Sequence, residues 1–222
     1  MYRRTERETA RLAARHEAII EAARALATES GLAAVQITPV AARAGIAAGT
    51  VYRYFPSKDD LVAALVSATA EREIAAIRAA AAAAPGALSG LAAAIMAFAA
   101  GTLRARRLAW AMLAEAFEGD ADAGRFAFRR SIGDEFEFLI RAAVAAGHLP
   151  DQPPPAMAAA VVGAVVESLV GPLAPNSAGL DADYAAVQAL ALFALRALGV
   201  ADARARGLVM SRVSNQRSGS IP

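Results

Sequence analysis

The sequence predicts an all-α protein of about nine helices, with a three-helix head at residues 1–62 and a larger helical body at residues 63–203. Hydrophobic residues make up 57% of the 222 positions, and alanine, the strongest helix former, dominates them. Apolar residues recur at helical spacing along most of the chain, and alternating strand patterns are hard to find. We expect the polar, aperiodic tail at residues 204–222 to be disordered.

The composition argues against catalysis. The chain has no cysteine, which excludes disulfides, thiol nucleophiles and cysteine-ligated zinc. Its only histidines, His16 and His148, suggest neither a catalytic triad nor a histidine-rich metal site. The sequence also lacks a glycine-rich phosphate loop. We therefore predict that the protein is not an enzyme and uses no metal and no cofactor.

The chain is further predicted to be cytoplasmic and to have no membrane segment. The N-terminus has no apolar core behind its charged residues, so it does not resemble a signal peptide. One long uncharged run, residues 79–103, has the length of a membrane span, but Pro85 and Gly86 interrupt it. Two helices joined at this point fit the pattern better.

Residues 3–30 are predicted to form the first helix, which ends at Gly31. The net charge of the whole chain is only +2, yet residues 1–16 contain five arginines and two glutamates. Two interpretations of these arginines stay open. They form either a flexible arm that reaches along an anionic partner such as DNA, or the ordinary solvated start of a helix.

Residues 36–58 predict a compact helix-turn-helix. Ala41 allows two short helices to cross closely, and Gly45, four residues later, accepts the positive φ that the turn requires. Val51, six residues after Gly45, is expected to point inward from the second helix.

The boundaries of these two helices follow from their capping residues. Thr38 is expected to be the N-cap of the first helix, with Pro39 at the first helical position. The second helix is expected to run from Ala48 to Phe55, where Pro56 stops it.

A longer helix is predicted from Ser57 toward Ala84. Ser57 would cap it, and Asp60 three residues later would complete a near capping box. Asp59 is favourable to the dipole of the first turn.

The stretch 36–58 is locally basic. It contains Arg43, Arg53 and Lys58 and no acidic residue. Arginine, lysine, threonine and tyrosine side chains all bind phosphate oxygens, so this stretch suits a nucleic acid. The alternative is an ordinary helical hairpin inside an all-α core.

The continuation from Tyr52 to Leu61, Tyr-Arg-Tyr-Phe-Pro-Ser-Lys-Asp-Asp-Leu, resembles the signature of the tetracycline-repressor (TetR) family of bacterial transcription regulators. The similarity extends from Ile19 to about Leu65. It implies a helix-turn-helix head and a helical body for effector binding and dimerisation. It also implies a repressor that binds a palindromic operator as a homodimer and is released by a small apolar or aromatic ligand. The alternative is a helical protein–protein interaction or scaffolding module without specific DNA binding.

The resemblance places the DNA-facing residues on and around the second helix of the helix-turn-helix. Those with a hydroxyl or ammonium group are interpreted mainly as phosphate contacts. The two alanines at its start offer only apolar contact with thymine methyl groups. The predicted DNA-binding residues are Gln36, Thr38, Arg43, Ala47, Ala48, Gly49, Thr50, Tyr52, Arg53, Tyr54 and Lys58.

The body begins with one or two helices at residues 87–117, the region richest in bulky apolar side chains. A further helix is expected at residues 125–146. Between them, residues 118–124 are interpreted as a surface loop and not as a calcium loop, because Gly124 stands where a ligand is needed. The resemblance implies an effector pocket in this body. Its predicted lining residues are Met96, Phe98, Trp110, Leu113, Phe117, Phe136 and Glu167.

The last regular helices are predicted at residues 156–170 and 181–198. The first is apolar nearly all round, so most of its sides must be buried. Burial against a second chain in a four-helix bundle and burial inside one subunit are both possible, and the resemblance favours the dimer. Glu167 is either an interface or solvent-edge residue or a contact to a ligand. The predicted dimer-interface residues are Val162, Val165, Val166, Leu169, Leu190 and Phe193.

Overall fold

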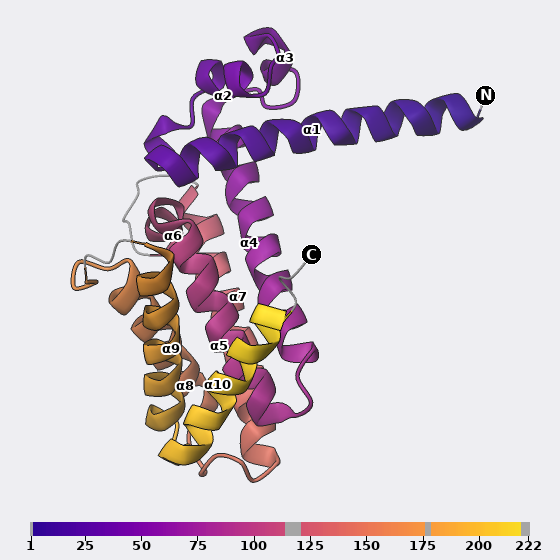
Figure 1. Ribbon diagram of the computed structural model, residues 1–222. Coiled ribbons are helices and arrows are strands. Elements are labelled where there is room, and N and C mark those ends of the chain that lie inside the picture. Colours follow the sequence, from indigo (N-terminus) through magenta and orange to yellow (C-terminus); the bar gives the residue numbers. More distant parts are fainter. Residues whose placement is uncertain (1, 114–120, 176–178, 219–222) are drawn as a thin grey trace. The chain divides into compact units, whose positions relative to one another are not determined.

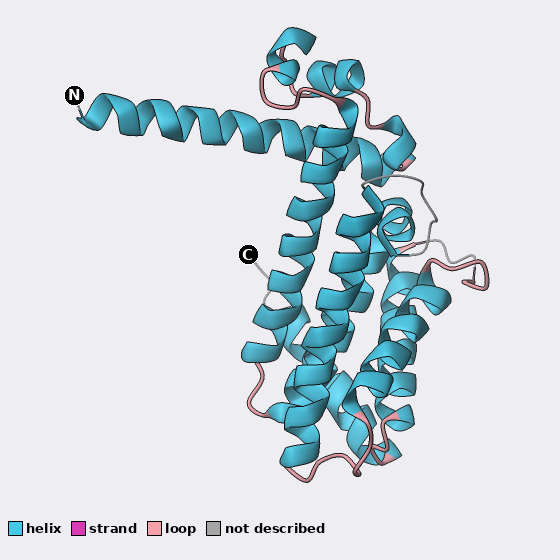
Figure 2. Cartoon of the chain, turned by 180° about the vertical axis from the view of Figure 1, so that it is seen from behind, coloured by secondary structure: helices cyan, strands magenta, loops and turns pink. Residues whose placement is uncertain are grey.

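The computed structural model describes residues 2–113, 121–175 and 179–218, which form ten α-helices, one short 3-10 helix and no strand (Figure 1). Figure 2 shows the same elements from behind, joined by loops alone. The all-α prediction is confirmed, with one more α-helix than expected. The helices are α1 (Tyr2–Ser30), η1 (Leu32–Ala34), α2 (Ile37–Arg43), α3 (Ala48–Tyr52), α4 (Lys58–Ala82), α5 (Ala87–Arg104), α6 (Arg106–Leu113), α7 (Ala121–Ala145), α8 (Pro154–Leu169), α9 (Leu180–Ala197) and α10 (Asp202–Ser218).

The chain divides into two compact units. Unit 1 comprises Met1–Glu71 and Arg107–Phe126, and unit 2 comprises Arg72–Arg106 and Ala127–Pro222. The boundary predicted after residue 62 therefore falls inside the part of α4 that belongs to unit 1. Most of α6 also belongs to unit 1, although it follows α5 of unit 2 in the sequence.

Unit 1 has a small apolar core around α2, which packs against α1 and α3. Ile19 of α1, Val40 of α2 and Val51 of α3 are fully buried, and the start of α4 adds Leu61. The core begins at Ile19, because residues 8–18 of α1 are all exposed.

Unit 2 is organised around α5, which packs against α8, α9 and α10. By length and composition α5 could cross a membrane, but 72% of it is buried inside the protein, as expected for a core helix. Phe98 of α5 and Phe136 of α7 are buried, with their ring centroids 5.8 Å apart. The predicted break at Pro85 and Gly86 is confirmed, because α4 ends at Ala82 and α5 begins at Ala87.

Five of the six predicted dimer-interface residues are buried within their own chain. A side chain that its own subunit already covers has little surface left for a partner, so burial within the chain gives these five no support as interface residues. They form the core side of α8 and α9, whereas Phe193 is 57% exposed. The five buried residues are Val162, Val165, Val166, Leu169 and Leu190.

The structure differs from the prediction of a disordered tail from residue 204, because α10 continues as far as Ser218. Ala205 and Val209, one turn apart, are buried, and α10 packs against α9 and α5. Asp202 in the first turn accepts hydrogen bonds from Arg206, at 2.8 Å, and from Arg196. These bonds hold the pKa of Asp202 below its ordinary value. Residues 219–222 lie outside the described part of the chain.

Helix α7 differs from the prediction at its N-terminal end only. The loop expected at residues 118–124 is helical from Ala121 onward, and residues 118–120 lie outside the described residues. At the other end, Gly147 has φ 69°, and the His148 N–H donates to the Ala143 carbonyl at 2.9 Å. This is a glycine-terminated helix end, near the predicted end of the helix.

Candidate nucleic-acid interface

The turn between α2 and α3 depends on a glycine. Gly45 has φ 65°. The Ile46 N–H donates to the Ala41 carbonyl at 3.0 Å, and the Gly45 N–H donates to the Ala42 carbonyl at 3.2 Å. These two bonds are those of a Schellman motif, which needs a left-handed residue where Gly45 stands. The turn predicted from the sequence is confirmed.

The start of α2 differs from the prediction by two residues. Its N-cap is Gln36, not Thr38, and Pro39 stands at the third helical position. The proline is tolerated there because the first four N–H groups of a helix have no partner inside it. The Gln36 side chain does not cap the helix. Its Nε2 donates instead to the Ala33 carbonyl at 3.2 Å, while Thr38 remains exposed.

The second helix, α3, has only five residues and ends at Tyr52, earlier than the predicted end at Phe55. The N–H groups of Tyr54 and Phe55 both donate to the Val51 carbonyl at 2.9 Å, which closes the helix with a turn. Pro56 disfavours the α conformation at Phe55, so the helix stops before it.

The capping box at the start of α4 is confirmed. The Asp60 N–H donates to Ser57 Oγ at 3.1 Å, and the Ser57 N–H donates to Asp60 Oδ2 at 3.0 Å. The box fixes the direction in which the chain leaves α3. It also places Lys58, an exposed residue, at the first position of α4.

None of the eleven predicted DNA-binding residues is buried. They lie on α2, its N-cap, the turn, α3 and its C-terminal turn, and the first residue of α4, all within unit 1. Ala48, Thr50 and Tyr54 are half-buried, and the other eight are exposed. The described part of unit 1 therefore leaves all eleven accessible to a partner.

Arg43, a predicted DNA contact, forms an ion pair that the sequence did not suggest. Its Nη1 and Nη2 donate to the two carboxylate oxygens of Glu29 at 2.5 and 2.6 Å, which ties α2 to the end of α1. The hydrogen bond from Arg43 lowers the pKa of Glu29 and raises that of Arg43. A carboxyl whose pKa is lowered on folding stabilises the fold above its ordinary pKa and loses this effect as the pH falls. The pair is therefore formed at neutral pH.

The backbone of Glu29 makes a further bond within unit 1, since its carbonyl accepts a hydrogen bond from Arg107 of α6. The partners of Glu29 are 14 and 78 residues away in the sequence. Helical periodicity shows only neighbours three or four residues apart, so it gave no signal for this cluster.

His16 connects α1 to the end of α3. Its ring centroid lies 4.9 Å from that of Phe55 and 6.4 Å from that of Tyr54, both in tilted arrangements. Phe55 is buried and His16 is largely exposed. The aromatic end of the helix-turn-helix thus packs against the middle of α1.

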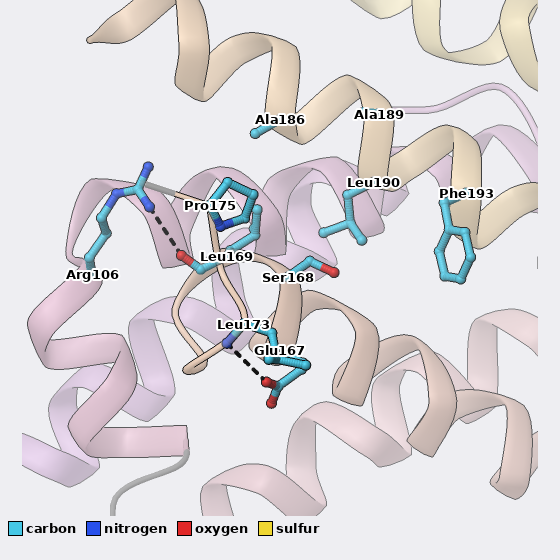
Figure 3. Close-up of a pocket in the computed structure, with 10 residues that line it drawn as sticks. All are labelled: Arg106, Glu167, Ser168, Leu169, Leu173, Pro175, Ala186, Ala189, Leu190 and Phe193. Carbon is cyan, nitrogen blue, oxygen red and sulfur yellow. Dashed lines mark hydrogen bonds between the residues drawn. The ribbon is translucent and has the colours of Figure 1, made fainter. Parts of the chain in front are cut away.

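Unit 2 contains an open cavity of about 530 Å³ between the end of α8, the following loop and α9. Its walls are mostly apolar and include Leu173 and Phe193 (Figure 3). Arg106 Nη1 donates to the Leu169 carbonyl at 3.0 Å, and Arg106 also bonds Asp183. Glu167 accepts a long hydrogen bond of 3.4 Å from the Leu173 N–H.

The predicted effector residues do not all meet at this cavity. Glu167 lines it, whereas Met96, Phe98 and Phe136 are buried elsewhere in unit 2. Trp110 and Leu113 belong to α6 in unit 1, and Phe117 lies outside the described residues. The cavity residues that the sequence did not suggest, such as Arg106 and Leu173, flank loops and helix ends.

Comparison with known proteins supports the family resemblance. Residues 19–65 match the family described as bacterial regulatory proteins, tetR family. The HTH-type transcriptional repressor KstR of Rhodococcus jostii is 47% identical over 58 residues, which are 26% of this chain and 27% of that protein. The match therefore spans about a quarter of the length of this curated relative. The similarity predicted from residues 19 to 65 is confirmed.

Solved structures extend the likeness to the whole fold. A TetR/AcrR-family regulator from Thermobifida fusca aligns with a TM-score of 0.65 at 23% identity, covering 82% of this chain and 96% of that one. The regulator FadR from Bacillus subtilis, in complex with stearoyl-CoA, gives a TM-score of 0.67 at 19% identity, with 80% and 96% covered. At these identities the likeness establishes the fold. The matched relatives are repressors and regulators, in agreement with the prediction that the chain is not an enzyme.

We expect Gly45→Ala to lower the free energy of unfolding of unit 1 by about 1–2 kcal/mol, the cost of a left-handed conformation for an L-residue. No atom lies within 4 Å of the added Cβ, so the cost is conformational. Gly49→Ala is the matched control, because Gly49 also has open space but lies inside α3. There we expect a gain of up to about 1 kcal/mol. Denaturation followed by circular dichroism, with amide exchange in α2 and α3, measures both; equal effects would contradict the role of Gly45.

Proposed function

We propose that this chain, which carries a tetR-family DNA-binding domain at residues 19–65, is a transcriptional repressor that binds operator DNA through α2, α3 and the start of α4. The observation that carries the proposal is the coincidence of the matched region with a correctly formed helix-turn-helix. All eleven predicted contact residues are accessible there. The similarity to the repressor KstR over 58 residues supports the sign of regulation.

The proposed contacts are of two kinds, those that position the domain on the phosphate backbone and those that recognise bases. Thr50, Tyr52, Tyr54 and Lys58 bind phosphate oxygens, which fix the register of the domain but carry no sequence information. The start of α3 offers only apolar side chains, so base recognition there is limited to thymine methyl groups. Arg53 is exposed and has the length and the N–H groups to donate to a base edge.

Lys58→Ala is expected to weaken binding to all duplex sequences alike and to make the dependence of log K on log salt less steep by about 0.9 per chain. The reason is the loss of one phosphate contact at an exposed position of α4. Fluorescence anisotropy with a duplex from the region upstream of the chain's own gene measures both effects. Arg130→Ala, at an exposed arginine of α7 in unit 2, is the control. Failure of the wild type to bind this duplex at low salt would overturn the proposal.

We further propose that the chain acts as a homodimer on a palindromic operator, with half-sites about 34 Å or a multiple of this apart. The outer sides of α8 and α9 support this. They carry no charged residue from Ala156 to Val166 or from Tyr184 to Leu195, and their small side chains permit close helix packing. The exposed residues on them include Ala159, Ala160, Gly163, Ala185, Ala189 and Phe193.

Gly163→Arg is expected to weaken the dimer roughly tenfold or more, because a charge would be buried in the contact without a partner. The chain itself tolerates the change, since no atom lies within 4 Å of a Cβ at this exposed position. Gly207→Arg on α10 is the control, with the same open space and exposure. Sedimentation at micromolar concentration measures the mass, and a monomeric wild type would contradict the dimer.

The proposed effector is a small apolar or aromatic compound bound in unit 2. The apolar walls of the cavity support this class, and Glu167 and Arg106 supply polar groups at its edge. The long acyl chain in the FadR complex suggests an apolar chain as one form of such a ligand. A ligand shifts the DNA-binding arrangement only if it binds one arrangement better than the other.

Two arginines adjacent in the sequence, one in each unit, could link ligand binding to the DNA-binding unit. Arg106 lines the cavity and bonds Leu169 and Asp183 in unit 2. The next residue, Arg107, bonds the carbonyl of Glu29 in unit 1. A ligand that displaces Arg106 therefore acts on the residue adjacent to the Glu29 cluster, which holds α2 through Arg43.

Ala186→Phe is expected to abolish release of the operator duplex by stearoyl-CoA, used as the probe, and to leave DNA affinity unchanged. The larger side chain would fill the cavity, whose wall includes Ala186. Ala182→Phe, one turn earlier on α9 and not part of the wall, is the control. The measurement is DNA anisotropy during titration with the probe. If stearoyl-CoA still released the duplex from the Ala186→Phe variant, the effector would bind elsewhere. If it never released the duplex from the wild type, an acyl chain would be excluded as the effector.

A further inference from the structure

The N-terminal half of α1 is a helix that its own unit does not use. Residues 8–18 are all exposed, and the core of unit 1 starts only at Ile19. Folding alone gives no reason for this part of the helix, because most helical stability in proteins comes from packing of a buried face.

From Arg3 to Ala18 the segment contains five arginines and three glutamates, Glu6, Glu8 and Glu17, a net charge of +2. Arg3, Arg4 and Arg7 are followed by Arg11 and Arg15, and from Arg4 onward the intervals are three, four and four residues. Among the residues whose side chains the structure describes, Arg11 and Arg15 lie on one side of the helix, together with Glu8 three residues before Arg11. Arg11 and Arg15 are exposed, and neither has an ion-pair partner within the ranges that the structure describes.

The segment also has a defined place beside the proposed DNA-binding surface. The His16 ring lies 4.9 Å from Phe55, at the end of the helix-turn-helix. From there α1 continues for 14 residues to Tyr2, which is about 21 Å at a rise of about 1.5 Å per residue. Figure 1 shows α1 passing α2 and α3 and extending beyond α3 to the N-terminus.

We infer that the N-terminal half of α1 is a second DNA-binding element, which contacts the phosphate backbone beyond the base pairs reached by α3. The inference rests on the proposed function of the helix-turn-helix. A length of about 21 Å corresponds to about six base pairs of duplex, where each strand carries a phosphate every 3.4 Å or so. The arginines of this element neutralise flanking phosphates, and the contact is independent of sequence.

The helical form distinguishes this element from a flexible arm. A segment that is already ordered loses less conformational entropy when it binds, so each arginine contact retains more of its favourable free energy. The helix also fixes the direction of the arginines relative to α3, because both belong to unit 1.

Self-association through this segment is less favoured. A coiled-coil seam needs apolar residues repeated over several turns. Leu12, which is 50% exposed, is the one large aliphatic residue between Glu8 and Ala18. A single leucine does not make a seam, whereas the repeated arginines match the regular charge of a duplex.

The test compares Arg11→Ala/Arg15→Ala with the wild type on two duplexes. Footprinting on the region upstream of the chain's own gene first locates the operator, and the short duplex contains only the base pairs that α3 would reach. The long duplex carries about ten further base pairs on each side, which is more than the six or so that α1 spans. On the longer duplex we expect weaker binding and a salt dependence less steep by about 1.8 per chain, about 0.9 for each lost contact. On the short duplex the two proteins should bind equally. Alanine preserves the helix, and circular dichroism checks this.

Arg129→Ala/Arg130→Ala, two exposed arginines of α7, is the charge-matched control and should change neither duplex. The inference would be overturned if Arg11→Ala/Arg15→Ala left the salt dependence of binding to the longer duplex unchanged. It would also be overturned if this variant changed the oligomeric mass of the protein without changing its DNA binding. Lys58→Ala separates this failure from failure of the proposed function. If Lys58→Ala weakens binding and the arginine pair does not, only the inference about α1 is lost.

Discussion

A helix of five residues has almost no stability of its own, since nucleating a helix costs more than its first hydrogen bonds return. Helix α3, the proposed DNA-facing helix, is such a helix, and its N-cap, Ala47, has no side-chain acceptor for the free N–H groups. It is therefore held from outside: by the glycine turn at Gly45, by the full burial of Val51 and by the bonds that Tyr54 and Phe55 make to the Val51 carbonyl. The proposed reading surface is thus a product of packing in unit 1, and any change in that packing alters the surface directly.

Glu29 is the point in unit 1 through which such a change can pass. Its carboxylate holds Arg43 of α2, and its carbonyl accepts from Arg107 of α6. An exposed ion pair stabilises by about 1 kcal/mol or less. Moving a two-state equilibrium from mostly bound to mostly released needs about 5.5 kcal/mol of differential affinity. In the proposed mechanism the Glu29 cluster is therefore too weak to supply the shift, and the free energy would have to come from the effector.

The sequence predicted the features that depend on local chemistry. The turn at Gly45 and the capping box of Ser57 and Asp60 are each decided within about six residues, so a pattern contains all of the information. The missed features depend on distant residues or on weak patterns. The ion pair of Glu29 with Arg43 joins segments that periodicity cannot relate, and α10 packs through a stripe as small as Ala205 and Val209. Interface residues are hard to predict for a different reason: an apolar side of α8 shows that a residue is covered, but not whether its own chain or a partner covers it.

The balance of charge and reading residues constrains how such a repressor finds its site. A good bidentate contact to a base discriminates by about 1–3 kcal/mol, and Ala47, Ala48 and Gly49 can make none. Arg43, which has the length to do so, is already bound to Glu29. Sequence preference must then come from few contacts and from the shape and deformability of the operator. Affinity has to come from phosphates, yet the chain as a whole carries a net charge of only +2. These two facts are compatible if positive charge is in local excess at the proposed DNA contacts, and residues 36–58 do contain Arg43, Arg53 and Lys58 and no acidic residue.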